Sequence, residues 1–184
     1  MATTHHTPVG RGYDTSLIYY HHQNDYWDFT YKSCPPNYTM FDLWNKYDDT
    51  PANATYGEPA KDYLNSMGCT STTQNASGTC VYEDDLFEER VHSIVAKHDP
   101  TTPLFVFWAT HTVHGPLQPP DAAYDNFSFI NVDNRRKYHS MVNYIDGTIG
   151  RVVQSFKNKG MFDELLIVSH ALSLSLSLSL QVTH

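Results

Sequence analysis

The sequence predicts an α/β fold in which helices flank a mostly parallel sheet. Residues 104–109 form an unbroken apolar run between Pro103 and a later Gly-Pro pair, which is typical of a strand buried on both faces. A helix of about 25 residues and a second apolar run, residues 165–168, come after it. Strand, long helix and strand in this order predict a right-handed crossover between parallel strands, with 104–109 as the central strand.

The first 82 residues are expected to be rich in loops. They show little hydrophobic periodicity, and prolines at positions 35, 36, 51 and 59 would interrupt regular structure. Only residues 16–20 have the composition of a short strand. So long a stretch without predicted elements is uncommon inside a complete domain, and we expect the domain to be incomplete.

Regular structure is predicted from Glu83 onward. Acidic residues occupy the first turn of this segment, and Lys97 and His98 the last, as the helix dipole favours. Pro100 and Pro103 would end the helix. Its apolar residues follow the three- and four-residue spacing of one helical face: Leu86, Phe87, Val91, Ile94 and Val95.

The second helix has the clearest periodicity in the chain. Asn131 or Asp133 is expected to cap its start, and Gly160 its end. Its apolar stripe is long and continuous: Tyr138, Met141, Val142, Ile145, Ile149, Val152, Val153 and Phe156.

The last residues, 169–184, have low complexity. Leucine and serine alternate from Leu172 to Leu180. A two-residue repeat has the periodicity of a half-buried or edge strand that is prone to aggregation. A translated CT dinucleotide repeat would produce the same alternation, and on that interpretation we expect this tail to lie outside the fold.

Composition excludes some classes of function. The formal net charge is −8 with only 12 basic residues, so we expect no nucleic-acid partner, because phosphate binding needs clustered lysine and arginine. The sequence holds no apolar run long enough for a membrane span. Its first residues lack the basic start and apolar centre of a signal peptide.

Other features are typical of secreted proteins. The chain has more Asn-x-Ser/Thr sequons than the roughly two expected by chance, although unused sequons remain an alternative. The predicted glycosylation sites are Asn37, Asn53, Asn75 and Asn126. Cys69 and Cys80 flank a polar loop that a disulfide could close, which would leave Cys34 over.

Two histidines are the best candidates for chemistry. His111 and His114 follow the predicted strand 104–109, and ligands of open α/β sheets bind beyond the carboxyl ends of strands. Such histidines can bind an anion or a metal, or act as a general acid, but they can equally be solvated or structural. The pairs His5-His6 and His21-His22 are more often surface residues than metal ligands, and we predict no metal site.

Three segments resemble the type I sulfatases, in particular the arylsulfatase B-like branch. His6–Ser16 matches a Thr-Pro-x-x-Arg-Gly-Phe/Tyr-Asp segment, residues 103–117 match a strand followed by a Val-His-x-Pro-Leu loop, and residues 135–150 match a family helix. The resemblance implies an alkaline-phosphatase-like α/β domain that is incomplete at both ends. Residues 1–168 would be its partial catalytic domain, with 1–82 loop-rich and 83–168 in the order α-β-α-β.

The resemblance implies a sulfuric ester hydrolase that uses calcium and formylglycine. His114 matches the family histidine that contacts the sulfate group. The formylglycine motif Cys-x-Pro-x-Arg has no counterpart, since no arginine follows Cys34-Pro35-Pro36, and the calcium-binding Asp-Asp and Asp-Asn-Gly-Gly motifs are missing too. We therefore expect these 184 residues alone to be inactive.

The family further implies a secreted or lysosomal protein that acts on a sulfated small molecule or glycan. One alternative is a noncatalytic secreted glycoprotein module with an anion- or glycan-binding loop. Another is a phosphatase or phosphodiesterase of the same superfamily, which the Val-His-x-Pro-Leu loop makes less favourable.

Overall fold

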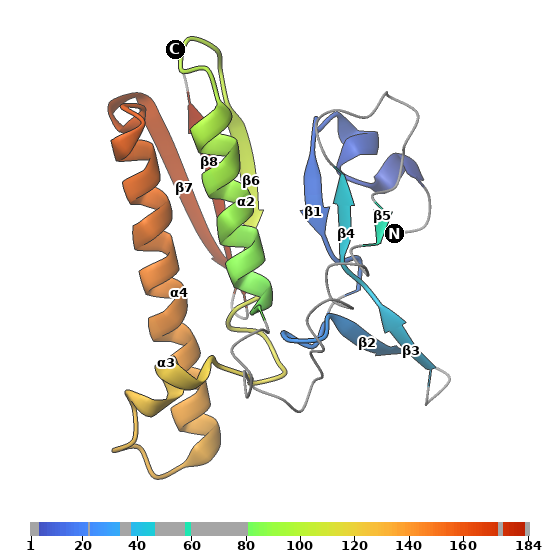
Figure 1. The fold of residues 1–184 in the computed structure, drawn as a ribbon, viewed down its shortest axis with the longest axis vertical. Coiled ribbons are helices and arrows are strands. Elements are labelled where there is room, and N and C mark those ends of the chain that lie inside the picture. The colour runs from blue at the N-terminus through green and yellow to red at the C-terminus, as the bar shows by residue number, and fades with distance from the viewer. Residues whose placement is uncertain are drawn as a thin grey trace. The chain divides into compact units, whose positions relative to one another are not determined.

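The structure, a computed structural model, divides into two compact units, Met1–Cys80 and Val81–His184 (Figure 1). It describes residues 4–21, 23–33, 38–46, 58–59, 81–172 and 175–182. The statements below concern these residues.

The first unit consists of short elements. Two 3-10 turns, η1 (Thr4–His6) and η2 (Val9–Arg11), come first, and Gly12 ends the second turn with φ 99°. The predicted strand at 16–20 is present as β1 (Ser16–Ile18). Two antiparallel sheets are formed, one with the order β1-β4-β5 and one pairing β2 with β3. The other strands are β2 (Thr30–Ser33), β3 (Tyr38–Phe41), β4 (Trp44–Lys46) and β5 (Glu58–Pro59).

A buried carboxylate, Asp42, organises this unit. It accepts hydrogen bonds from the backbone N–H of Tyr20 (3.0 Å) and of His21 (2.7 Å) and from the Trp44 indole (2.8 Å). The His21 Nδ1 atom lies 2.6 Å from the same carboxylate. Four apolar side chains described in this unit are also buried: Tyr26, Trp27, Phe29 and Leu43. Among the described residues of this unit, the loop residues around Asp42 are therefore held by hydrogen bonds to its side chain.

The second unit contains two long helices that lie on one face of a sheet (Figure 1). Helix α2 (Glu83–Lys97) and helix α4 (Asp133–Asn158) confirm the two helices predicted from apolar spacing. A short α3 (Asp121–Asp125) and a 3-10 turn η3 (Phe162–Glu164) were not predicted. The buried apolar residues of α2 and α4 form the core: Phe87, Val91, Val95, Met141, Ile145, Val152 and Phe156.

The ends of α4 match the predictions only in part. Gly160 has φ 74°, and the N–H groups of Gly160 and Met161 donate to carbonyls of the last turn, so the predicted glycine ending is confirmed. The predicted cap at the start is wrong, because the N-cap residue is Val132 and makes no side-chain cap bond. Asp133 instead pairs with Lys137 in the first turn.

The sheet of the second unit differs from the prediction. Strands β6 (Phe105–Ala109), β7 (Leu165–Leu172) and β8 (Ser175–Val182) have the order β6-β8-β7, and both pairings are antiparallel. Strands β6 and β7 therefore run in the same direction without pairing, and β6 lies at the edge. The predicted parallel neighbours, and the central place of residues 104–109, are not observed among the described strands.

The Leu-Ser segment explains this difference. We expected residues 169–184 to lie outside the fold, whereas Ser175–Val182 pair along both other strands. The two-residue repeat has strand periodicity. It also follows β7 so closely in sequence that pairing costs little loop-closure entropy.

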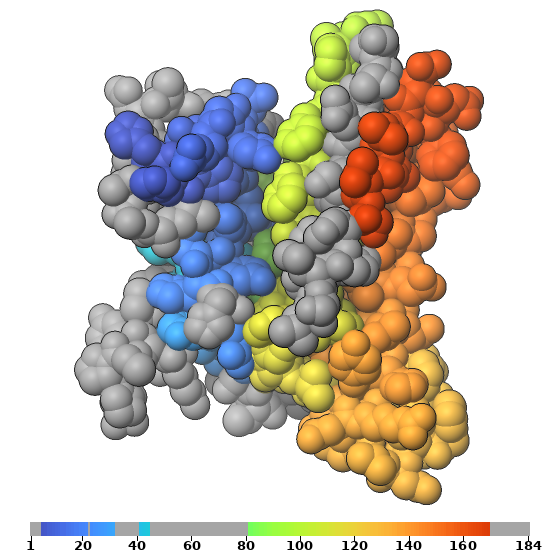
Figure 2. All heavy atoms as spheres, turned by 180° about the vertical axis from the view of Figure 1, so that it is seen from behind, coloured from blue at the N-terminus to red at the C-terminus, as the bar shows by residue number. Residues whose placement is uncertain are grey.

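The prediction that residues 104–109 are buried on both faces is wrong for this chain. Val106 and Trp108 are buried, but Phe105 and Phe107 are each 53% exposed. On β7, Leu166 and Val168 are each 50% exposed. Side chains alternate between the faces of a strand, and α2 and α4 cover one face only. Figure 2 shows side chains of β6 and β7 at the surface on the side away from the view of Figure 1.

Within the part of the chain described here, no helix has the length and apolar character that crossing a membrane requires.

Candidate functional site

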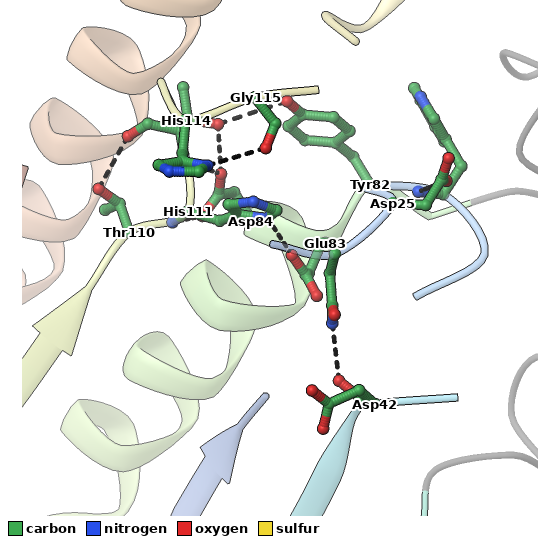
Figure 3. A network of polar contacts seen from close by, with 12 residues as sticks. Asp25, Asp42, Tyr82, Glu83, Asp84, Thr110, His111, His114 and Gly115 are labelled. Atoms are coloured by element: carbon green, nitrogen blue, oxygen red, sulfur yellow. Dashed lines mark hydrogen bonds and ion pairs between the residues drawn. The ribbon is translucent and has the colours of Figure 1, made fainter. Parts of the chain in front are cut away.

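The candidate site is the loop that follows β6, residues 110–115. The first turn of α2 lies against this loop and contributes two adjacent acidic residues, Glu83 and Asp84 (Figure 3). Both acids are buried, as are Thr110, His111 and Thr112 of the loop. A buried polar loop must find hydrogen-bond partners, and here the acids of α2 are among them.

Asp84 contacts the loop backbone directly. Its Oδ1 accepts a hydrogen bond from the N–H of His111 at 3.1 Å, and its Oδ2 accepts one from the N–H of Thr112 at 2.9 Å. The Thr112 hydroxyl donates to the same Oδ2. Both carboxylate oxygens are thus used, which fixes the plane of the carboxylate against the peptide between the two loop residues.

His111 is a buried residue of this network. Its Nδ1 lies 2.5 Å from Oε2 of Glu83, and both side chains are fully buried. A buried imidazole in contact with a carboxylate is held in one orientation. The sequence left the role of His111 open. In the structure, its contact with Glu83 attaches the loop to the first turn of α2.

His114 has a different environment, since it is only half-buried. Its Nδ1 lies 2.9 Å from the carbonyl oxygen of Gly115. A carbonyl can only accept, so Nδ1 carries the proton, and in the neutral ring Nε2 has the lone pair. When the ring is charged, Nε2 is a donor that can bind an anion. The backbone N–H of His114 also bonds to the carbonyl of His111 at 2.9 Å, which closes a turn.

Burial changes the acidity of the groups around the loop. Removal of water raises the pKa of Asp84 to about 6, and the charge of Glu83 acts in the same direction, while the bond from Thr112 and the charge of His111 oppose them. Burial likewise raises the pKa of Tyr82, whose hydroxyl lies 3.3 Å from the Thr112 hydroxyl. Asp84 is ionised at neutral pH but holds its proton more tightly than an exposed aspartate.

Helix α2 is in turn tied to α4 by polar contacts. The Tyr144 hydroxyl donates to Asp85, and Arg151 donates to both carboxylate oxygens of Glu88, at 2.6 and 2.7 Å. Burial raises the pKa of Glu88, but the bonds from Arg151 and His92 outweigh it and lower the pKa overall. These contacts fix the helix whose first turn holds the loop.

The described residues do not fit the cofactors that the sequence resemblance implies. Among them, no group of three or more His, Cys, Asp or Glu side chains could hold a metal ion. The carboxylate oxygens of Asp84 are occupied by loop donors. No cysteine from which formylglycine could form lies among the described residues.

The other predicted sites fall in different places. Asn126 is exposed at the end of α3, and Ser128 of its sequon is exposed too. His5 and His6 are exposed, while His21 is held by Asp42. Several predicted residues lie outside the described residues: Asn37, Asn53, Asn75, His22, Cys34, Cys69 and Cys80.

Sequence reasoning missed the role of Glu83 and Asp84, which were attributed to the helix dipole alone. A signal was present in the sequence. Acids that only interact with the helix dipole can stay exposed. Glu83, however, lies four residues before Phe87 and eight before Val91, on the apolar face of the helix, and Asp84 is next to it, so burial of these acids could be expected.

Comparison with known proteins gives a consistent result. A family model described as sulfatase matches residues 10–170. The chain is 31% identical over 162 residues to arylsulfatase J of Mus musculus. This match covers 88% of the chain and 23% of the length of the mouse protein, so the chain spans about a quarter of that relative.

Proposed function

Because the chain belongs to the sulfatase family, we propose that it is part of an arylsulfatase-type sulfuric ester hydrolase and that His114 contacts the sulfate group of the substrate. The observation that carries this proposal is the geometry of His114. Its Nδ1 is bound by the Gly115 carbonyl, so the loop backbone sets the orientation of a ring that is only half-buried. The loop that carries it follows the end of β6 and is held by the buried acids of α2.

The imidazole can act in two ways on a sulfate ester. In its charged form, Nε2 can donate to a sulfate oxygen and stabilise negative charge there. The same proton can protonate a leaving-group oxygen, which is general acid catalysis. One histidine does not also supply a covalent nucleophile, and the sequence contains no Cys-x-Pro-x-Arg motif. We therefore propose that these 184 residues bind a sulfate ester but do not hydrolyse it on their own.

The wider biology is part of the same proposal. The substrate class is a sulfated small molecule or glycan, and the protein is secreted or lysosomal. Glycosylation at Asn126 fits its exposed position after α3. The sequons at Asn37, Asn53 and Asn75, and a disulfide between Cys69 and Cys80, complete the proposed secretory features. Residues 1–168 form the partial catalytic domain.

A second candidate is a noncatalytic secreted glycoprotein module whose loop binds an anion or glycan. The half-buried His114 ring, held by the Gly115 carbonyl, can bind an anion whether or not hydrolysis follows, and this observation is compatible with such a module. The two candidates predict the same binding by this chain. They differ in whether the chain is part of a protein that hydrolyses the bound ester.

Binding is tested by titrating the 184-residue chain with p-nitrophenyl sulfate and following the histidine ring signals by NMR. We expect the His114 signals to shift and His114→Ala to weaken binding about tenfold or more. His98→Ala is the matched control, because the His98 ring also bonds to a carbonyl of its own loop, Thr102 O at 2.9 Å. Equal affinity in both variants would refute the role of His114.

Turnover is tested on the same samples by release of p-nitrophenol. We expect no rate above buffer for the chain or for either variant. A calcium-dependent rate that disappears in His114→Ala would contradict the proposed inactivity, while leaving the proposed sulfate contact in place.

A further inference from the structure

We propose that Asp84 is the positioning residue of His114, so that a carboxylate on α2 sets the direction in which the imidazole meets the sulfate group. This inference rests on the proposed role of His114. The loop after β6 contains no regular element, and a fixed direction for the His114 ring needs an anchor elsewhere. Asp84 provides one because it is fully buried and its two oxygens bind consecutive residues of the loop.

The connection from Asp84 to the ring has three hydrogen-bonded steps. Asp84 holds the N–H groups of His111 and Thr112. The carbonyl of His111 then accepts the N–H of His114 at 2.9 Å, which fixes the backbone of His114 relative to the held peptide. Finally, the Gly115 carbonyl holds Nδ1 of the ring. Figure 3 shows Asp84, His111, His114 and Gly115 in this network. We expect loss of the Asp84 contact to release the peptide on which the other two contacts depend.

Helix capping alone does not explain this acid. A capping side chain accepts N–H groups of its own helix, and the N-cap residue of α2, Tyr82, makes no such side-chain bond. Asp84, the second residue of the helix, binds a segment 27 and 28 positions later in the sequence. An ionised carboxylate is costly to bury, so its burial here is offset by donors from the loop. The raised pKa of Asp84 agrees with that cost.

The test uses Asp84→Asn, which keeps the shape of the side chain but leaves one acceptor oxygen instead of two. The matched control is Asp85→Asn, the same change one residue along, because Asp85 accepts from Tyr144 of α4 rather than from the loop. Three quantities are measured by NMR on the 184-residue chain. They are hydrogen-exchange protection of the His111 and Thr112 amides, the His114 ring signals, and affinity for p-nitrophenyl sulfate.

We expect Asp84→Asn to lower the amide protection and the affinity about tenfold each and to move the His114 ring signals. Asp85→Asn should keep all three within about twofold. A purely structural role would lower the melting temperature of the Asp84 variant and leave the ligand-free ring signals of the folded fraction unchanged. Unchanged ring signals or unchanged protection in folded Asp84→Asn would overturn the proposal.

Failure of the proposed function gives a different result. If the unmodified chain does not bind p-nitrophenyl sulfate, the sulfate contact of His114 fails, while protection and ring signals still decide the role of Asp84. Should Asp84→Asn not fold, Thr112→Val removes the hydroxyl contacts with Asp84 and Tyr82 but keeps the backbone N–H that Asp84 accepts. That variant is expected to lower Thr112 amide protection about threefold and to shift the His114 ring. No change in either would also overturn the proposal.

Discussion

Two buried aspartates, Asp42 in the first unit and Asp84 in the second, accept hydrogen bonds from loop backbone in different settings. Asp42 binds the N–H groups of Tyr20 and His21 and lies between short strands. Asp84 binds the N–H groups of His111 and Thr112 but belongs to a helix of 15 residues that packs on a second helix. The same type of contact thus supports a loop from a position between short strands in one case and from a long helix in the other.

The difference shows what each unit depends on. In the first unit the carboxylate is itself a large part of the frame, since four donor groups converge on it. In the second unit the buried apolar residues between α2 and α4 provide the stability, and the Asp84 carboxylate attaches the loop to α2. Removal of the aspartate should therefore affect stability in the first unit and geometry in the second.

The largest expected effect is that of Asp42→Ala. Four donors would lose their acceptor, at about 1–3 kcal/mol for each that stays buried, so the first unit should lose more than about 3 kcal/mol. The indole N–H signals of Trp27 and Trp44, followed by NMR during urea titration, report on this unit. Asp28→Ala is the control, because Asp28 accepts local hydrogen bonds from Thr30, two residues along the chain. If the urea midpoint of unfolding were equal in the two variants, the stability of the first unit would not depend on the hydrogen bonds of Asp42.

The next effect tests the apolar frame of the second unit. Phe156 of α4 is fully buried, and Phe156→Ala should lower the free energy of unfolding by about 3–5 kcal/mol. Phe162→Ala, at a residue that is 36% exposed, should cost less than about 1 kcal/mol. Thermal unfolding followed by far-UV circular dichroism measures both. Similar losses of unfolding free energy in the two variants would mean that apolar packing between α2 and α4 does not stabilise this unit.

The same contrast explains which features could be predicted from the sequence. Helices α2 and α4 were predicted because their apolar residues recur every three or four positions, which is a local signal. The bonds of Asp42 to Tyr20 and of Asp84 to Thr112 join residues 22 and 28 positions apart and leave no periodic trace. The position of His114 on a loop after a strand could be predicted from the sequence, and its contact with sulfate stays a prediction.

The pairing of the strands was also predicted wrongly from the sequence. The sequence predicted strands at residues 104–109 and 165–168, and the structure has β6 and β7 there, but the sequence did not exclude a third strand between them. The Leu-Ser repeat has two interpretations, as a strand or as a low-complexity tail, and composition alone does not decide between them. Pairing partners depend on three-dimensional competition for the same backbone groups.

A third prediction uses pH to separate Asp84 from its surroundings. Because its pKa rises from 3.8 to about 6 on folding, the folded chain binds this proton more tightly than the unfolded chain does. The free energy of unfolding should therefore fall as pH rises from about 4 to about 6, by roughly 3 kcal/mol from this group, and stay level above that range.

Other groups titrate nearby, so the measured quantity is the difference between the unmodified chain and Asp84→Asn in urea unfolding at several pH values. Glu83, Tyr82, His111 and Tyr144 face or surround Asp84 and are shared by both proteins. We expect the Asn variant to be relatively more stable at pH 7 than at pH 4.5. A difference that is constant with pH would contradict the raised pKa of Asp84.

The smallest expected effect concerns the contact that ties α2 to α4. Arg151 donates to both oxygens of Glu88, but its side chain is 54% exposed, so water screens the pair. Arg151→Ala should lower the free energy of unfolding by only about 1 kcal/mol, mainly because the nearly buried Glu88 loses its charged partner. Arg135→Ala, at an exposed position of the same helix, is the control and should change stability by less than about 0.5 kcal/mol. If Arg151→Ala cost as much as Phe156→Ala, the frame of the second unit would depend on a buried charge as the first unit does, and the contrast between the two aspartates would disappear.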